Sequence, residues 1–379
     1  MMLPTPRALY RGLRKLLRFL AAPARRGGRG GGRVIHTYRG YGSRSECFLM
    51  GRVFLQPGLG LKLPGPVDDL VNIVRRTVRW GVRDQRVWVR VGRVETEVVT
   101  DSDGYFSVHL DIESQLPAGA FWQRAELTLL PAGHPRGQPP PASHSLPWAS
   151  AQIFIPAEEV DLGVISDIDD TVIYTGVASK LKMMYRLFVQ KARHRTAFPG
   201  VSALYRGLFH GGDGQARRPL LYVSRGPWSI YEMLGEFFHL QRIPYGPILF
   251  LREWGATLQR PLPRRAKDHK AMLIRRMLAL YDQLPFILIG DSGQQDPEVY
   301  ARIVAEHPGR IRAIYIRHVH SRPDRDTDIQ TLAEQVAASD CEMVLAEDSL
   351  AMAEHAFQRG FISEQALGEV REESRRTVT

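Results

Sequence analysis

The sequence predicts an α/β protein in which a doubly wound parallel-sheet domain follows a small β-sandwich-like domain. Two observations predict this architecture. Residues 158–379 alternate apolar strand-like runs with helical segments, which is typical of parallel strands covered on both faces. Residues 34–157 carry short strand-like runs separated by turn residues, which is typical of antiparallel strands. Residues 1–33 fit neither pattern, so we expect an N-terminal tail before the two domains.

The tail, residues 1–33, combines positive charge with a helical stripe of leucines. It holds nine lysines and arginines and no acidic residue, so it supplies most of the net charge of +11. The leucines recur at helical spacing opposite the basic residues, which is typical of a helix that lies on an anionic membrane surface. A helix packed on the body is the alternative. The stripe consists of Leu9, Leu13, Leu16, Leu17 and Leu20.

Charge and cysteine usage restrict the cellular setting. Little positive charge is left outside the tail, so nucleic acid is not the favoured partner. Cys47 and Cys341 lie far apart in the sequence, which excludes a disulfide framework and favours a reducing compartment. No apolar run approaches the roughly 20 residues of a membrane-spanning helix. We expect a cytoplasmic protein, with peripheral membrane association and an organelle transit segment left open.

The β-rich domain, residues 34–157, shows no catalytic constellation. Residues 100–104 predict a turn between two strands, and the Pro- and Gly-rich residues 131–147 predict a longer loop. Residues 71–80 predict a helix packed on the strands. The expected strands are residues 86–91, 95–100, 104–112, 124–130 and 151–156.

The domain of residues 158–379 predicts a parallel sheet with right-handed helical crossovers. Its apolar runs are each followed by a helical segment. The expected strands are residues 160–166, 219–224, 247–251, 285–291, 311–317 and 341–346. The expected helices are residues 199–208, 228–240, 267–281, 297–306, 327–338 and 349–358.

Polar side chains gather where these strands end. Asp167-Ile-Asp-Asp-Thr171 follows the first strand, Ser224-Arg-Gly226 the second, and Asp291 to Asp296 the fourth, while Lys267 and Lys270 open the helix before the fourth. In such a sheet, ligands bind beyond the carboxyl ends of the strands. Carboxylates crowded together cost energy unless a positive charge neutralises them. The sequence therefore predicts one crevice that contains a lysine and a cation.

The order of these motifs resembles the haloacid-dehalogenase-like superfamily of phosphotransferases. The D-x-D-x-T motif corresponds to Asp167, Asp169 and Thr171, the strand-end hydroxyl to Ser224, and the lysine to Lys270, which is favoured over Lys267. The acidic metal motif corresponds to Asp291 with Asp296.

The resemblance implies a role for each motif residue. Asp167 would be the nucleophile that forms an aspartyl-phosphate, and Asp169 the general acid and base. Mg²⁺ would be held by Asp167, the Asp169 backbone carbonyl and Asp291, with Asp296 either a direct ligand or behind one. Ser224, the lysine and the backbone N–H groups that follow the serine would bind phosphoryl oxygens.

Longer stretches of the sequence resemble one group within this superfamily, and this closer resemblance indicates a class of substrate. DIDDTV, YVSRGPW and FILIGDSGQQDPEVY resemble the fungal actin-patch phosphatidate phosphatases and their bacterial relatives over roughly residues 160–320. This resemblance implies Mg²⁺-dependent hydrolysis of phosphatidate to diacylglycerol and phosphate. Arg225 and Gly226 would contribute to substrate binding, and a surface ion pair is the alternative for Arg225.

Residues 177–198 are apolar, aromatic and basic together, at the place where family members carry a flap or cap. An apolar edge with cations suits an amphiphilic phosphate ester, and a core-packed helix with a solvated basic end is the alternative.

Two other functions of the chain stay open. One is a phosphatase of a soluble or nucleic-acid phosphate ester, and the other is a non-catalytic lipid- or cytoskeleton-binding module.

Deleting residues 1–33 should weaken binding to anionic vesicles, because each basic residue near such a surface contributes about 1 kcal/mol. The remaining binding should be less sensitive to salt, since screening acts on exposed charges. Vesicle co-sedimentation of the full and truncated chains checks this, and turnover of a water-soluble phosphate ester is the control that should survive. Unchanged vesicle binding would show that the leucine stripe is not a membrane face.

Overall fold

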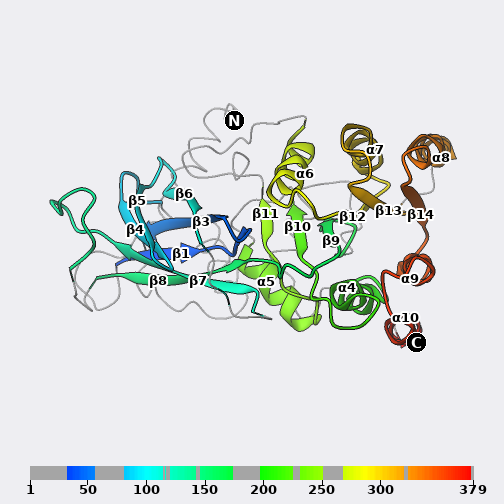
Figure 1. Cartoon of the computed structure of the whole chain (residues 1–379), viewed down its shortest axis with the longest axis horizontal. Coiled ribbons are helices and arrows are strands. Elements are labelled where there is room, and N and C mark those ends of the chain that lie inside the picture. The colour runs from blue at the N-terminus through cyan, green and yellow to red at the C-terminus, as the bar shows by residue number, and fades with distance from the viewer. Residues whose placement is uncertain are drawn as a thin grey trace, which may run out of the picture. The chain divides into compact units, whose positions relative to one another are not determined.

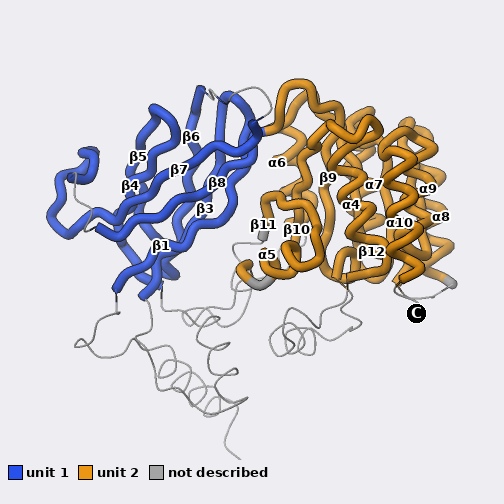
Figure 2. The backbone as a smooth tube through the Cα atoms, turned by 90° about the horizontal axis from the view of Figure 1, so that it is seen from below, with its two compact units in different colours: residues 1–155, 227–230, 252–264 blue, residues 156–226, 231–251, 265–379 orange. Residues whose placement is uncertain are grey.

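The computed structural model describes residues 32–55, 81–113, 116, 120–141, 146–173, 197–224, 231–250, 268–319 and 323–376. The chain divides near residue 155 into two compact units (Figure 2). Residues 1–31 of the expected tail, the expected helix at residues 71–80 and most of the expected flap at residues 177–198 lie outside the described residues. Arg33, the last residue of the expected tail, is the first residue of a strand.

Unit 1 is built from β-strands that share one hydrogen-bonded network. Its strand order is β1-β3-β2-β8-β7-β4-β5, and β6 pairs with β3. All pairings are antiparallel except that of β2 with β8. A sandwich of two packed layers stays a prediction. The strands are β1 (Arg33–Thr37), β2 (Gly40–Gly42), β3 (Glu46–Leu55), β4 (Arg86–Val91), β5 (Val94–Val99), β6 (Tyr105–Asp111), β7 (Trp122–Leu129) and β8 (Trp148–Phe154).

The core of unit 1 follows the two-residue period of its strands. Val87, Val89 and Val91 of β4 are buried, as are Ala125, Leu127 and Leu129 of β7, because alternate side chains point to the same face. The sequence did not resolve β1 to β3 individually. A Cβ atom at Gly51, within β3, would lie 2.2 Å from the ring of Phe106, which belongs to β6. The Phe106 ring therefore occupies the space that a side chain at position 51 would need, and this glycine interrupts the alternation of side chains along β3.

Unit 2 contains the parallel sheet that the sequence predicts. Its order is β11-β10-β9-β12-β13-β14, and every pairing is parallel. Along the chain the strands run outward from β9 first to one side and then to the other. Such a reversal leaves a ligand crevice beyond the carboxyl end of the central strands. The strands are β9 (Gly163–Asp167), β10 (Leu220–Ser224), β11 (Ile248–Phe250), β12 (Phe286–Asp291), β13 (Ile311–Arg317) and β14 (Glu342–Ala346).

Helices lie on both sides of this sheet (Figure 1). In that view α6, α7 and α8 lie on one side and α4, α5, α9 and α10 on the other. Each expected helix has a counterpart, with bounds that differ by up to four residues. The helices are α4 (Val201–His210), α5 (Tyr231–Leu240), α6 (His269–Leu280), α7 (Asp296–Glu306), α8 (Pro323–Ala337), α9 (Ser349–Gln358) and α10 (Glu364–Arg376).

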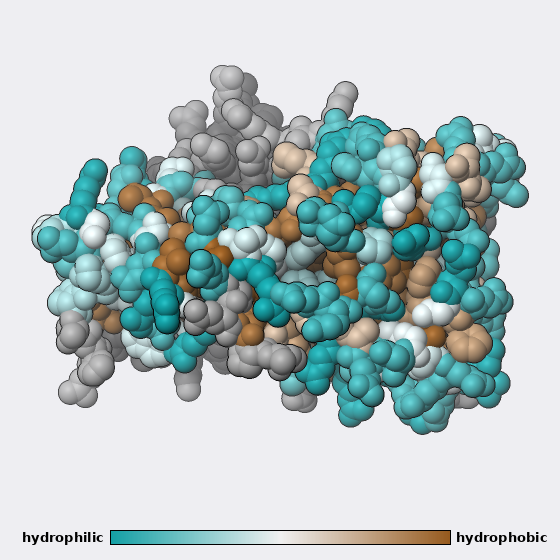
Figure 3. Space-filling view, viewed as in Figure 1, coloured by the Kyte–Doolittle hydropathy of each residue, from teal (hydrophilic) through white to brown (hydrophobic). Residues whose placement is uncertain are grey.

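Among the described helices, none has the length and apolar character needed to cross a bilayer. On the face drawn in Figure 3, most described residues at the surface are hydrophilic, and apolar ones show in the recesses between them. This is the distribution expected where the apolar side chains form the core.

Helix α10 was not predicted, because its sequence is mostly charged and only Ala366, Leu367 and Val370 are buried. It packs against α4 and α9. Its Glu373 accepts a hydrogen bond from the Ala203 backbone N–H at 2.9 Å and pairs with Arg206. The N-cap of α4 is a glycine without a side-chain cap, so Glu373 satisfies a helix-end N–H group from outside the helix.

Glu373→Ala should lower the free energy of unfolding by about 1 kcal/mol, as expected when a helix cap is removed. Urea denaturation followed by circular dichroism measures this change. Glu372→Ala is the matched control, because Glu372 is exposed and its ion pair among the described residues is with Arg376 of the same helix. Equal losses for the two variants would show that Glu373 does not cap α4.

Candidate active site

Three adjacent strands bring their last residues to the same edge of the sheet. In the strand register, Val223 of β10 lies beside Asp167, and Ile289 of β12 lies beside Ser166. Ser224, Asp167 and Asp291 therefore end neighbouring strands at nearly the same level. The convergence expected from the sequence follows directly from this parallel register.

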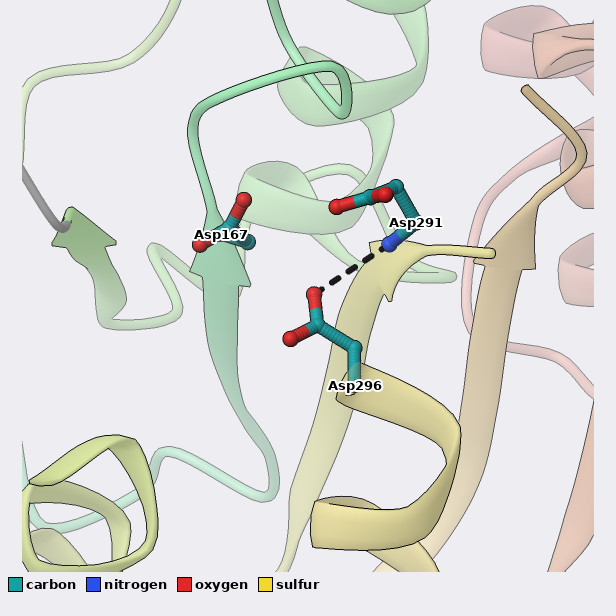
Figure 4. Close-up of side chains that lie close together, drawn as sticks. All are labelled: Asp167, Asp291 and Asp296. Carbon is teal, nitrogen blue, oxygen red and sulfur yellow. Dashed lines mark hydrogen bonds between the residues drawn. The ribbon is translucent and has the colours of Figure 1, made fainter. Parts of the chain in front are cut away.

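Three buried carboxylates form the centre of the site. Oxygens of Asp167, Asp291 and Asp296 all lie within 4.8 Å of one another, and each residue is at most 1% exposed. Figure 4 shows Asp167 and Asp291 facing each other from the ends of β9 and β12, with Asp296 below them at the start of α7. Because water is excluded, their mutual repulsion is poorly screened.

Lys270 supplies a positive charge to this cluster. It is the second residue of α6, and its side chain is buried. Its Nζ lies 2.8 Å from Asp167 Oδ1 and also pairs with Asp296 Oδ1. Lys267, the other lysine considered, lies outside the described residues. One ammonium group leaves the three carboxylates with excess negative charge.

Asp296 is held by the chain through both of its oxygens. Oδ1 accepts from Lys270, and Oδ2 accepts from the Asp291 backbone N–H at 3.2 Å (Figure 4). Glycine at position 290 permits this approach, since a Cβ atom there would lie 2.4 Å from Asp296 Oδ2. With both oxygens engaged, Asp296 suits a role in positioning Lys270 and the end of β12.

A tight turn returns the chain to the cluster after β9. Val172 donates its backbone N–H to the Ile168 carbonyl at 3.0 Å, and Asp170 has a φ of 56°. This is a left-handed conformation that Asp tolerates better than most residues. The turn brings an Asp169 carboxylate oxygen within 3.5 Å of the Ser224 hydroxyl. Thr171 is buried, and among the described residues its hydroxyl has no hydrogen-bond partner.

The structure adds two residues that sequence reasoning did not identify. Arg317 ends β13, is buried, and donates its Nε to the Thr171 carbonyl at 3.1 Å. Its guanidinium lies over the Phe198 ring, 4.2 Å from the centroid. Extending the strand-end rule to β13 would have identified it. Gln294 lies in the loop after β12 and donates to Asp291 Oδ2 at 2.7 Å. Its position within the acidic motif is the only sequence signal.

Burial dominates the electrostatics of the two strand-end carboxyls. It raises the pKa of Asp167 well above its usual range, with Lys270 opposing the shift and the carboxylates of Asp296, Asp169 and Asp291 adding to it. Burial, followed by the charge of Asp296, raises the pKa of Asp291 to about 7, and Lys270 opposes this shift as well. Both shifts express the cost of uncompensated negative charge.

The donor set fits a hard divalent cation. Carboxylate and carbonyl oxygens are the ligands that Mg²⁺ prefers. The contact of Lys270 with Asp167 Oδ1 is an ion pair without a directed hydrogen bond, so this buried oxygen keeps lone pairs to offer. Asp167, Asp291 and the Asp169 carbonyl could hold such a cation. Arg225 and Gly226, expected to bind substrate, lie outside the described residues.

Comparison with known proteins identifies the segment that contains this site. Residues 162–318 match the family model "Phosphatidate phosphatase APP1, catalytic domain". Phosphatidate phosphatase APP1 of Saccharomyces cerevisiae is 32% identical over 157 residues, which cover 41% of this chain and 26% of that protein. An uncharacterized protein of Schizosaccharomyces pombe is 31% identical over 160 residues, covering 42% and 26%. The matches thus span about a quarter of the length of these relatives.

These matches confirm the resemblance to the fungal phosphatidate phosphatases over the segment that carries all the predicted motifs. Among solved structures, a carbohydrate acetylesterase from Xanthomonas citri aligns over 79% of this chain and 72% of its own. Its identity of 10% and TM-score of 0.25 give it no weight in assigning the fold.

Asp291→Asn should raise the melting temperature measured in EDTA at mildly alkaline pH, because it removes one of the mutually repelling buried charges. It should also reduce the further rise that Mg²⁺ produces in the wild-type chain. Asp282→Asn, at an exposed position after α6, is the matched control and should change neither value.

The same charge predicts a pH dependence. The folded pKa of Asp291, about 7, exceeds the unfolded value of about 3.9, so the folded chain binds more protons between these values. In EDTA, wild-type stability should therefore fall as the pH rises from about 4 to about 7, and this fall should be smaller in Asp291→Asn. A variant that melts earlier than wild type in EDTA at mildly alkaline pH would contradict the charge-repulsion account.

Proposed function

We propose that this chain is a Mg²⁺-dependent phosphatase that hydrolyses phosphatidate to diacylglycerol and phosphate through an aspartyl-phosphate on Asp167. The observation that carries the proposal is the meeting of Asp167, Asp291, Lys270 and Ser224 at one sheet edge, within the segment similar to a phosphatidate phosphatase catalytic domain. The strand order, reversed at β9, supports the doubly wound haloacid-dehalogenase-like arrangement.

In the first half-reaction, an Asp167 carboxylate oxygen attacks phosphorus and forms an acyl-phosphate bond while the ester P–O bond breaks. Asp169 gives a proton to the departing diacylglycerol oxygen. In the second half-reaction, Asp169 takes a proton from a water molecule that attacks the phosphorus. Phosphate leaves, and the Asp167 carboxylate is regenerated. The partly exposed position of Asp169, beside Ser224, suits a group that must reach both the leaving oxygen and water.

The remaining residues bind and orient. Lys270, 2.8 Å from Asp167, would hold a phosphoryl oxygen close to the nucleophile, and Ser224 would donate a hydrogen bond to another. Asp167, Asp291 and the Asp169 carbonyl would hold Mg²⁺, which would supply positive charge against the phosphoryl oxygens. Asp296 would keep Lys270 and the end of β12 in place. Arg225 and Gly226, which follow Ser224 in the sequence, would contribute to substrate binding.

A lipid substrate also requires access to a membrane. The basic leucine-striped tail at residues 1–33 and the apolar, basic segment at residues 177–198 are the features of the sequence that suit an anionic lipid surface. We propose a cytoplasmic protein that associates peripherally with membranes through the tail.

Asp167→Asn should abolish Mg²⁺-dependent phosphate release from phosphatidate in mixed micelles, because it removes the nucleophile and keeps the side-chain shape. Asp170→Asn is the matched control in the same turn, since asparagine also tolerates the left-handed conformation at position 170. The control should keep activity near the wild-type level. Circular dichroism and melting curves establish that both variants are folded.

Activity of Asp167→Asn within about tenfold of wild type, a difference of only about 1.4 kcal/mol in the barrier, would rule out the covalent mechanism. A panel containing nucleotides, sugar phosphates and phosphorylated oligonucleotides tests the substrate separately. Faster turnover of any of these than of phosphatidate would overturn the lipid assignment and leave the chemistry standing.

A further inference from the structure

The side-chain amide of Gln294 points into the middle of the carboxylate cluster. Its Nε2 donates to Asp291 Oδ2 at 2.7 Å and lies 3.4 Å from the Asp169 carbonyl oxygen and 3.5 Å from Asp167 Oδ2. One nitrogen therefore faces three oxygens, which come from the ends of β9 and β12 and from the turn that follows β9.

These three oxygens belong to the groups proposed to hold Mg²⁺. A primary amide nitrogen carries two N–H donors and no acceptor, so its positive end faces the oxygens. A Mg²⁺ ion would bring ligand oxygens to about 2.0–2.1 Å, in a shell closed around the ion. An N–H donor held against the same oxygens would place its partial positive charge beside the cation, and the two would repel each other. The amide in this rotamer and the cation thus exclude each other.

The loop that presents Gln294 is held firmly, so a rotation of its side chain is the smallest change that can clear the space. Gly293 donates its N–H to Asp291 Oδ1 at 2.8 Å. Arg325 of α8 donates to the carbonyls of Ser292 at 3.0 Å and Gln294 at 2.7 Å, and it pairs with Glu298 of α7. The Gln294 side chain itself is only partly buried and can turn toward solvent.

We propose that Gln294 is a built-in competitor of the cation: its amide binds the ligand oxygens, lowers the affinity for Mg²⁺, and turns away when the cation enters. The inference rests on the proposed function, because it takes the cation site from there. With the amide in place, the ligand carboxylates are partly compensated and stay close together. The cost is a lower affinity for the metal.

Isothermal titration calorimetry with Mg²⁺ and melting curves in EDTA test this on the full chain. Gln294→Ala should bind Mg²⁺ roughly tenfold more tightly than wild type, which is the scale of one hydrogen bond to a charged group. It should also melt at a lower temperature in EDTA, because the carboxylates lose their donor. Gln294→Met keeps the length of the side chain but removes the N–H donors. It should show the same tighter Mg²⁺ binding and lower melting temperature, and it tests the inference if the alanine variant disturbs the loop.

Gln295→Ala is the matched control. Gln295 is the adjacent residue, exposed at the N-cap of α7 without a side-chain capping hydrogen bond, so both measurements should match wild type. Weaker or unchanged Mg²⁺ binding by both Gln294 variants would overturn the inference, since the side chain would then be a ligand or a bystander. Tighter binding without a lower melting temperature in EDTA would overturn it as well.

Failure of the proposed function gives a different result. A wild-type chain that binds no Mg²⁺ would remove the cation site itself, together with this inference. A wild-type chain that binds Mg²⁺, with variants that bind no more tightly, would remove only the role of Gln294.

Discussion

Compensation of buried negative charge is the constraint on which the rest of the site depends. Carboxylate oxygens of the buried residues Asp167, Asp291 and Asp296 lie within 4.8 Å of one another. Lys270 contributes one positive charge against these three carboxylates. Burial and the neighbouring carboxylates raise the pKa of Asp167 and of Asp291, although Lys270 opposes both shifts. Every further donor directed into the cluster, from the Asp291 backbone N–H to the Gln294 amide, reduces the same deficit. A divalent cation would complete the compensation, and a phosphate ester would arrive where positive charge is concentrated.

The fold produces this crowding through ordinary features of a parallel sheet. The strand order reverses at β9, so the ends of β10, β9 and β12 form one edge. The first turns of α6 and α7 then add Lys270 and Asp296 from one side of the sheet. Local details make the approach possible, namely glycine at position 290 and the left-handed residue Asp170. Strand β13, next to β12, contributes Arg317, which donates a hydrogen bond to the Thr171 carbonyl.

The sequence predicted the parts of this arrangement that depend on periodicity and strand order. Apolar runs located β9, β10 and β12, and the strand-end rule then placed Asp167, Ser224 and Asp291 together. Contacts set by tertiary packing were beyond its reach. Arg317 contacts Thr171, from which it is separated by 146 residues in the sequence. The direction of the Gln294 side chain depends on a loop to which Arg325 of α8 donates a hydrogen bond. Helix α10 was missed because its three buried residues are diluted by charged ones, and β3 was obscured by the glycine that accommodates Phe106.

The central claim is that phosphorus becomes covalently attached to Asp167 during turnover. Asp169→Asn removes both the proposed general acid and the proposed general base, so it should slow both half-reactions on phosphatidate. With an activated substrate, whose leaving group needs no proton, only release of the intermediate is slowed, so the intermediate should be trapped by a rapid acid quench. Peptide mapping by mass spectrometry after incubation with that substrate and Mg²⁺ locates the modification. The account predicts an acid-stable, hydroxylamine-labile phosphoryl group on Asp167, absent when Asp167 is also changed to asparagine. Phosphate attached to another residue, or wild-type turnover with no trappable phosphoenzyme even with an activated substrate, would contradict it.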